Sequence, residues 1–155
     1  MQMRDFVVRF AGEGGQGVVT SAEGLAQAST QVGYHALTYA TFPSQIMGGP
    51  TWTQARISDQ PNLRAGDDVD DLVAFNREAY ETHGSEVREG GVIIYNSDDK
   101  EFENFAPTDG SKSFGLPIDE LARSTGNNRS ANMVVMGALA PVSYTHLTLP
   151  TNREV

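Results

Sequence analysis

Five residues between positions 12 and 17 have the types and spacing most suited to binding chemistry. They are Gly12, Gly14, Gly15, Gln16 and Gly17, in the run Gly12-Glu-Gly-Gly-Gln-Gly17. Glycine adopts positive φ without a Cβ clash and lets another group approach the backbone closely. The run follows an apolar segment and precedes a helical pattern, so we expect a strand, a tight bend and a helix. The first N–H groups of such a helix suit a phosphate, a carboxylate or a partner's backbone.

The run satisfies the pattern G-x-G-x-x-G, which is a weak signal by itself. A dinucleotide site also needs an acidic residue at the end of the second strand, about 20 residues further on. The segment 34–41 ends without one, and no acid follows before Asp59. A phosphate-binding loop of the Gly-Lys-Ser/Thr kind is absent as well. Two interpretations stay open: a tight strand-to-helix turn without a ligand, and a bend that meets a cofactor or a partner protein.

A second glycine feature is the loop that contains Gly48 and Gly49, followed by Pro50. Met47 and Trp52 flank it. An apolar, flexible loop beside a tryptophan can line a cofactor or a subunit interface. An equally good interpretation is a surface turn next to a core tryptophan.

The histidines indicate no catalytic or metal site. His35, His83 and His146 each lack a companion at metal-ligand spacing, and no Ser-His-Asp arrangement is suggested. The chain has no cysteine, which excludes a thiolate nucleophile, a disulfide framework and a cysteine-ligated zinc or iron–sulfur centre within it. We therefore predict that this chain carries no catalytic residue and no metal ligand of its own.

Two acidic clusters can also be interpreted without a ligand or a catalytic role. A run of four acids is most simply a solvated turn and the start of a helix: Asp67, Asp68, Asp70 and Asp71. Asp98 and Asp99 follow the apolar segment 92–95, at a strand end where α/β proteins bind ligands. A helix cap or a solvated loop is the favoured interpretation for this second pair.

Length, composition and net charge limit the kinds of partner that we expect for this chain. The chain has 155 residues, which suits one domain, and a net charge of −9. Such a charge disfavours nucleic acid and anionic membrane surfaces. No apolar run reaches the roughly 20 residues of a membrane span, and the N-terminus lacks a signal-peptide pattern. We expect a soluble, cytoplasmic protein.

The pattern of elements predicts an α/β domain. Segments 6–11, 20–32 and 34–41 read as strand, helix and strand, which implies a right-handed parallel unit. Period-two alternation over 51–58 places Trp52, Gln54 and Arg56 on one side of a further strand. The remaining predictions are a strand or helix edge over 69–75, a helix over 77–87, a turn at 89–91, a buried strand over 92–95, a short strand over 114–117, helical turns over 118–124 and a helix over 133–139. The predicted fold is a three-layer Rossmann-like domain with a mostly parallel sheet.

The C-terminal end departs from this pattern. Pro141 breaks the helix that begins near Met133. Residues 142–155 then alternate threonine and leucine and resemble translated sequencing-adapter artefacts. We predict a domain over 1–141, incomplete at its C-terminus, followed by a non-native or disordered tail over 142–155, so that the natural protein is longer.

With both glycine features placed, the sequence resembles the gamma subunit or gamma domain of the 2-oxoacid:ferredoxin (acceptor) oxidoreductases, which include pyruvate, 2-oxoglutarate and ketoisovalerate enzymes. The similarity covers about residues 5–140. It is strongest over Val7–Ser58, and again at Asn132-Met133 and Gly137–Leu139. The segment Thr41–Pro50 is similar to the form in which this domain is fused ahead of the alpha subunit.

The resemblance implies a component of an enzyme that oxidatively decarboxylates a 2-oxoacid with coenzyme A, giving an acyl-CoA, CO2 and reduced ferredoxin. It implies that alpha and beta parts hold thiamine diphosphate and magnesium, and that cysteine-bearing parts hold the iron–sulfur clusters. The gamma domain packs against those parts near the path of coenzyme A. The residues assigned to that region are Gly12, Gly14, Gly15, Gln16, Gly17, Gly48 and Gly49. Two alternatives remain: a stand-alone nucleotide-binding Rossmann-like module, and a non-catalytic structural subunit. The isolated chain is expected to be inactive.

Overall fold

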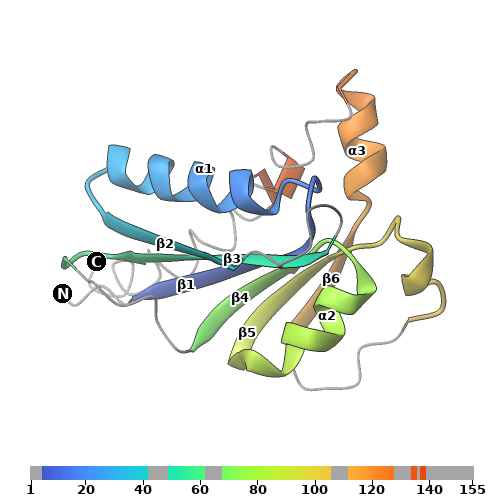
Figure 1. The fold of residues 1–155 in the computed structure, drawn as a ribbon, viewed down its shortest axis with the longest axis horizontal. Coiled ribbons are helices and arrows are strands. Elements are labelled where there is room, and N and C mark those ends of the chain that lie inside the picture. The colour runs from blue at the N-terminus through green and yellow to red at the C-terminus, as the bar shows by residue number, and fades with distance from the viewer. Residues whose placement is uncertain are drawn as a thin grey trace, which may run out of the picture.

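One six-stranded sheet organises the chain (Figure 1). The computed structural model describes residues 5–41, 49–61, 68–105, 112–127, 134–135 and 137–138. The strand order is β2-β3-β1-β4-β5-β6, with strands β1 (Phe6–Glu13), β2 (His35–Thr41), β3 (Pro50–Ser58), β4 (Val69–Ala74), β5 (Val87–Asn96) and β6 (Lys112–Leu116). The helices are α1 (Val18–Gln31), α2 (Arg77–His83) and α3 (Ile118–Ser124), with the 3-10 turns η1 (Gly84–Glu86) and η2 (Lys100–Phe102).

Five of the six strands run in the same direction. β1, β4, β5 and β6 pair in parallel, and β3 is antiparallel to both β1 and β2. β3 reverses because the connection from Thr41 to Pro50 is too short for a parallel crossover, which needs a dozen or more residues. The mostly parallel sheet is therefore confirmed. The strand–helix–strand unit is also parallel, but β3 lies between its two strands.

Helices cover both faces of the sheet, so the three-layer prediction is confirmed. α1 lies across β1, β2 and β3 on one face, and α2 lies against β1, β4 and β5 on the other (Figure 1). Each face has its own apolar core. Phe6, Val8 and Phe10 of β1 join the α1 core, while Ala11 joins the α2 core. The alternation along β1 thus decides which helix each residue meets.

The segment between α2 and β5 differs from the prediction. The predicted helix over 77–87 ends at His83, and a 3-10 turn leads directly into β5 at Val87. The predicted turn at 89–91 lies within that strand. Gly90 has φ +83°, and the β4–β5 register shifts between Val69 and Asp71, so a bulge absorbs these residues without ending the strand.

Two of the four acids in the acidic run do not lie in the solvated turn and helix start that the pattern predicted, whereas Asp68 is exposed at a bend as expected. Asp70 and Asp71 lie in β4, and both are buried. Asp70 Oδ2 accepts a hydrogen bond from Val7 N at 2.7 Å and forms an ion pair with Arg88. Asp71 Oδ1 accepts from Val92 N at 3.3 Å. Burial, with a smaller effect of the Asp70 carboxylate, raises the pKa of Asp71 to about 7. Charge predicts exposure poorly here because each of these two carboxylates accepts a hydrogen bond from a backbone N–H group of a neighbouring strand.

Several predictions fall on residues outside the described ranges. These are Gly48, Asp67, His146, most of the helix over 133–139, and the tail over 142–155, so the domain boundary at 141 stays a prediction. Residues 134–135 and 137–138 are helical, and Val135 joins the α1 core. No helix within the described residues has the length and apolar character needed to cross a bilayer.

Candidate functional site

The glycine bend is open to solvent at its tip. β1 continues through Gly12 and Glu13, which pair with Thr51 and Pro50, so the bend itself starts at Gly14. Gly15 has φ +94°, and a Cβ added there would meet nothing within 4 Å. Gly17 has φ +90° and precedes the first turn of α1. The tip is therefore glycine because of its backbone conformation, and the space beside Gly15 is available to another molecule.

Gly12 is glycine for a different reason. It is buried, and an added Cβ would lie 2.6 Å from Gln16 Oε1 and 2.8 Å from Phe75 Cβ. Gln16 Oε1 accepts from Glu13 N at 2.7 Å and from Asn76 Nδ2 at 3.4 Å. The amide oxygen of Gln16 thus holds the bend together, which leaves its Nε2 facing away from these partners. Close internal packing therefore explains why position 12 is a glycine. This agrees with the interpretation in which the turn binds no ligand.

The two predicted glycine features meet. Gly14 N donates to Gly49 O at 3.4 Å, which joins the bend to the residue just before β3. Gly49 is buried. The first N–H groups of α1 follow directly and have no partner within the helix. The bend, Gly49 and the helix start therefore form one site at the ends of β1 and β3.

A mainly apolar cleft of about 340 Å³ lies beside this site. Trp52 and His83 both line it and contact each other edge to face, with ring centroids 6.0 Å apart. The lining residues are Ala11, Gly12, Thr41, Pro50, Thr51, Trp52, Asn76, Glu78, Ala79, Thr82 and His83. The tryptophan near the second glycine loop is thus partly exposed and borders a cleft, so it is not an ordinary core residue.

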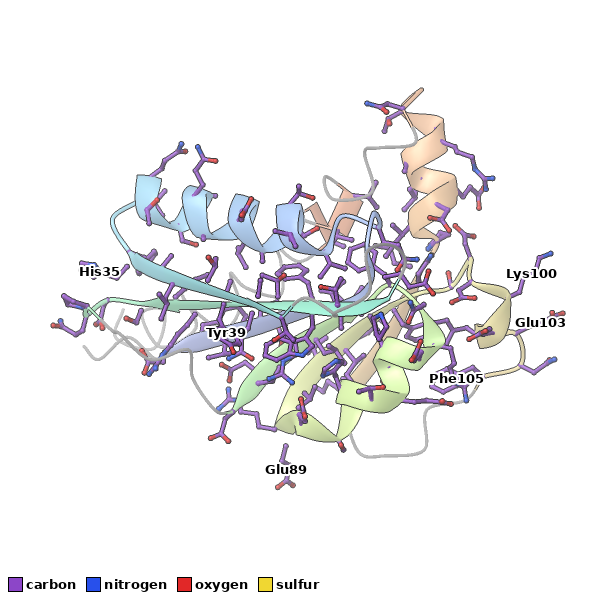
Figure 2. All side chains as sticks on the ribbon, in the orientation of Figure 1. His35, Tyr39, Glu89, Lys100, Glu103 and Phe105 are labelled. Atoms are coloured by element: carbon purple, nitrogen blue, oxygen red, sulfur yellow. The ribbon has the colours of Figure 1, made fainter. Side chains whose placement is uncertain are left out.

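A buried arginine fixes the position of Trp52. The Arg9 guanidinium lies 4.4 Å from the centre of the indole ring, a cation–π contact. Arg9 also donates to Gln54 Oε1 from Nη2 at 2.7 Å and from Nε at 3.1 Å, and it forms an ion pair with Glu86. Only 10% of the Arg9 side chain is exposed, so these contacts immobilise the guanidinium. Tyr39 flanks the indole from β2, with centroids 5.6 Å apart, and lies on the α2 side of the sheet (Figure 2).

The same arginine sets the state of His83. Arg9 Nη1 lies 3.2 Å from His83 Nδ1. Nδ1 also lies 3.3 Å from Glu86 Oε2, a carboxylate oxygen that can only accept, so these two contacts favour opposite tautomers of the neutral ring. Burial, and then the Arg9 charge, lower the pKa of His83 to about 4, so the ring is uncharged at neutral pH. Sequence patterns missed Arg9 and His83 as site residues. The only signal was an arginine within an apolar strand, opposite Gln54 of β3.

An acidic cleft of about 530 Å³ lies on the other side of the bend. Its lining residues are Glu13, Gln16, Phe75, Asn76, Glu78, Asn96, Asp98, Asp99, Lys100, Glu101 and Asp119. The favoured interpretation of the second acidic pair is confirmed. Asp98 Oδ2 accepts from Glu120 N at 2.8 Å, and Asp99 accepts from the backbone N of Arg77 at 3.3 Å and of Glu101 at 3.0 Å. The excess of carboxylates here repels phosphates.

The strand order also argues against a dinucleotide site. In that site the second strand lies next to the first and carries the acid that binds the ribose. Here β3 separates β2 from β1, and β2 ends at Thr41 without an acid. In the ranges that the structure covers, no group of three or more His, Asp or Glu residues could hold a metal ion.

The comparisons with known proteins agree with this fold. A family model described as pyruvate ferredoxin/flavodoxin oxidoreductase matches residues 7–152. The chain is 32% identical over 154 residues to a ketoisovalerate oxidoreductase subunit VorA of Methanothermobacter marburgensis, covering 99% of this chain and 32% of the relative. It is 29% identical to the pyruvate synthase subunit PorC of the same organism, covering 88% of this chain and 76% of the relative.

Two solved structures are similar as well. A 2-oxoglutarate:ferredoxin oxidoreductase from Magnetococcus marinus, with 2-oxoglutarate, coenzyme A and succinyl-CoA bound, has a TM-score of 0.79 and 34% identity, over 88% of this chain and 24% of that one. The gamma subunit of a keto/oxoacid ferredoxin oxidoreductase from Geobacter sulfurreducens has a TM-score of 0.77 and 27% identity, over 88% and 74%. The chain spans about a third of the ketoisovalerate subunits and a quarter of the Magnetococcus chain. With its fold and most of its length matched, this chain belongs to the pyruvate ferredoxin/flavodoxin oxidoreductase family.

Proposed function

We propose that this chain is the gamma-type component of a 2-oxoacid:ferredoxin oxidoreductase that converts a 2-oxoacid and coenzyme A to an acyl-CoA and CO2. The observation that carries the proposal is the exposed glycine bend at the start of α1, joined to Gly49 and open at Gly15. Family membership and the relatives' names support the reaction class. The complex would act in the cytoplasm, with ferredoxin as its electron acceptor.

The described residues do not fit the redox and decarboxylation cofactors. The chain has no cysteine for an iron–sulfur cluster. Within the described ranges there is also no cluster of His, Asp or Glu for the magnesium ion of thiamine diphosphate. We propose that alpha and beta parts supply these groups, and that no residue of this chain is catalytic.

The bend does fit a part of coenzyme A. Gly14, Gly15 and Gly17 offer a backbone that a ligand can approach, and the amide nitrogen of Gln16 has no partner among the described residues. Coenzyme A carries the thiol that accepts the acyl group. In this proposal the chain binds and orients that cofactor with N–H donors of the bend and of the first turn of α1. The acidic cleft on the far side of Gln16 disfavours an approach of phosphates from that direction.

We further propose that the natural protein is the fused form, with this domain ahead of an alpha part. Identities to the long polypeptides are 30–34%, and those to the short subunits are 22–30%. A structural subunit without a ligand is the second candidate, and the internal packing of Gly12 favours it.

Replacing Gly15 tests the proposal. Gly15→Val places a β-branched side chain in the open space at the bend, where we expect a rise of about tenfold in the KM for coenzyme A, or a matching loss of assembly with the partner polypeptides. Gly33→Val is the matched control, because Gly33 has φ +99°, an equally open Cβ position, and lies at the other end of α1. Both variants carry the same backbone strain, so only Gly15→Val should affect the reconstituted enzyme. Normal assembly and an unchanged KM in Gly15→Val would favour the structural candidate.

A further inference from the structure

The strand β2 forms an exposed edge of the sheet, and among the described residues no further strand lies beside it. All seven of its residues, His35–Thr41, pair with β3 without a register shift, so its free side is regular. The strand contains no Asp, Glu, Lys or Arg, no proline and no glycine. Sheet edges are usually protected by such residues or by bulges, because an open edge can pair with a strand of another chain. β6, at the other edge, is shorter and begins with Lys112.

The order of the residues in β2 favours a second copy of this chain as the partner. We propose that two copies pair through β2 in antiparallel fashion, about a twofold axis at Thr38. The strand is nearly symmetric about that residue, with one large apolar side chain and then one alanine on each side. The opposite pairs are then Thr38 with Thr38, Leu37 with Tyr39, and Ala36 with Ala40. Moving the axis to Leu37 or Tyr39 would leave two residues of each strand without a partner.

The side chains that this pairing covers are accessible in the single chain. Tyr39 is 53% exposed, Thr38 is exposed and Leu37 is half-buried. Tyr39 lies on the face of the sheet opposite α1 (Figure 2), and Leu37, two residues earlier in the strand, lies on the same face. Each of the two Leu37–Tyr39 pairs removes apolar surface from water and so stabilises the paired strands.

The position of α1 leaves room for the second copy. Opposite residues of an antiparallel pair point to the same face, so both α1 helices lie on the same side of the joined sheet. α1 lies across β1, β2 and β3, and β3 is the middle strand of these three. With neighbouring strands about 4.8 Å apart, the two copies of β3 are about 14 Å apart. Helices pack at about 8–10 Å, so this spacing accommodates both α1 helices.

The charge of the chain sets the expected salt dependence of the dimer. Each copy has a net charge of −9, so two copies repel one another, whereas β2 itself contributes no carboxylate to that repulsion. Salt screens the repulsion between the copies. We therefore expect the dimer to become tighter as the NaCl concentration rises from about 20 mM to about 500 mM. Weaker association at high salt would indicate binding through opposite charges and would overturn the proposal.

Sedimentation velocity of the 155-residue chain measures the association. We expect a weak dimer with a Kd of about 100 µM, because one seven-residue edge buries less than the roughly 1,200 Å² of a stable interface. Thr38→Lys and Thr38→Glu each place like charges opposite one another at the axis, so each should weaken the dimer at least about tenfold. An equimolar mixture of the two variants should restore association, because lysine then faces glutamate. Phe114→Lys, at an exposed position on the other edge strand, should leave the Kd unchanged.

The mixture separates a direct contact at Thr38 from a general effect of the substitutions. Thr38 is exposed, so both variants should keep the urea midpoint of the parent chain. A chain that stays monomeric up to about 1 mM would overturn the proposal. So would a dimer that persists in Thr38→Lys, a mixture that stays monomeric, or loss of the dimer in Phe114→Lys. The proposal uses β2 alone and does not depend on the reaction proposed above, so coenzyme A binding at the bend has no bearing on these outcomes.

Discussion

Asp71→Asn is expected to stabilise the chain above pH 7, by up to about 4 kcal/mol. Asp71 is buried with a pKa raised from 3.8 to about 7, and one pKa unit corresponds to about 1.4 kcal/mol. The native state binds more protons at this group than the unfolded state, so its contribution to stability falls as pH rises from about 4 to 7. Asparagine keeps the oxygen that accepts from Val92 N and removes the buried charge. Urea denaturation between pH 4 and pH 8 measures the effect.

His83 gives this experiment an internal check, because its effect has the opposite sign. With a pKa lowered from 6.5 to about 4, His83 adds stability as pH rises through that window. In the parent chain the two effects partly cancel. In Asp71→Asn the rise due to His83 remains alone, so stability should increase from pH 4 to pH 6.5. A variant that is less stable than the parent at pH 8 would contradict the assignment of a costly buried carboxylate.

Gly91→Ala is expected to destabilise the fold by at least about 3 kcal/mol. An alanine Cβ would overlap the carbonyl oxygen of Asp70 and lie 2.9 Å from the carbonyl oxygen of Arg88. Both are backbone atoms at the β4–β5 bulge, so the contact can be relieved only by moving two paired strands. Chemical denaturation of the purified variant measures the loss directly.

Its neighbour Gly90 provides the matched control. Gly90 has φ +83°, but an added Cβ meets nothing within 4 Å. Gly90→Ala should therefore cost only the strain of a left-handed conformation, about 1–2 kcal/mol. The order of the two variants tests the close approach of β5 to Asp70. Equal losses of stability in the two variants, or a larger loss in Gly90→Ala, would show that the backbone at the bulge does not crowd Gly91.

Local patterns predicted those elements in which the spacing of apolar residues along the chain determines which side chains are buried. The alternation over 51–58 placed Trp52, Gln54 and Arg56 on one face of β3, and Ala55 and Ile57 indeed join the α1 core. Gly33 ends the first helix as a left-handed glycine. These features depend on residues close in sequence, so the sequence is sufficient to predict them.

Non-local contacts account for what the patterns missed. Asp71 looked like a solvated charge, but it is buried, and one oxygen of its carboxylate accepts from Val92 N, 21 residues later in the chain. Arg9 interrupts an apolar strand and becomes part of a site only because Gln54 and His83 arrive beside it from β3 and α2. No pattern in a single sequence shows that these three residues lie together in space. The antiparallel insertion of β3 is also set by the length of a connection rather than by the residues of the strand.

Amide hydrogen exchange at the glycine bend tests most directly whether the bend receives a group from outside the chain. The measurement compares the free chain with the chain assembled with its partner polypeptides in the presence of coenzyme A. Our account predicts slower exchange at Gly14, Gly15 and Gly17 in the assembly, with unchanged exchange at Gly33. Exchange at Gly15 that stays as fast in the active assembly as in the free chain would contradict it.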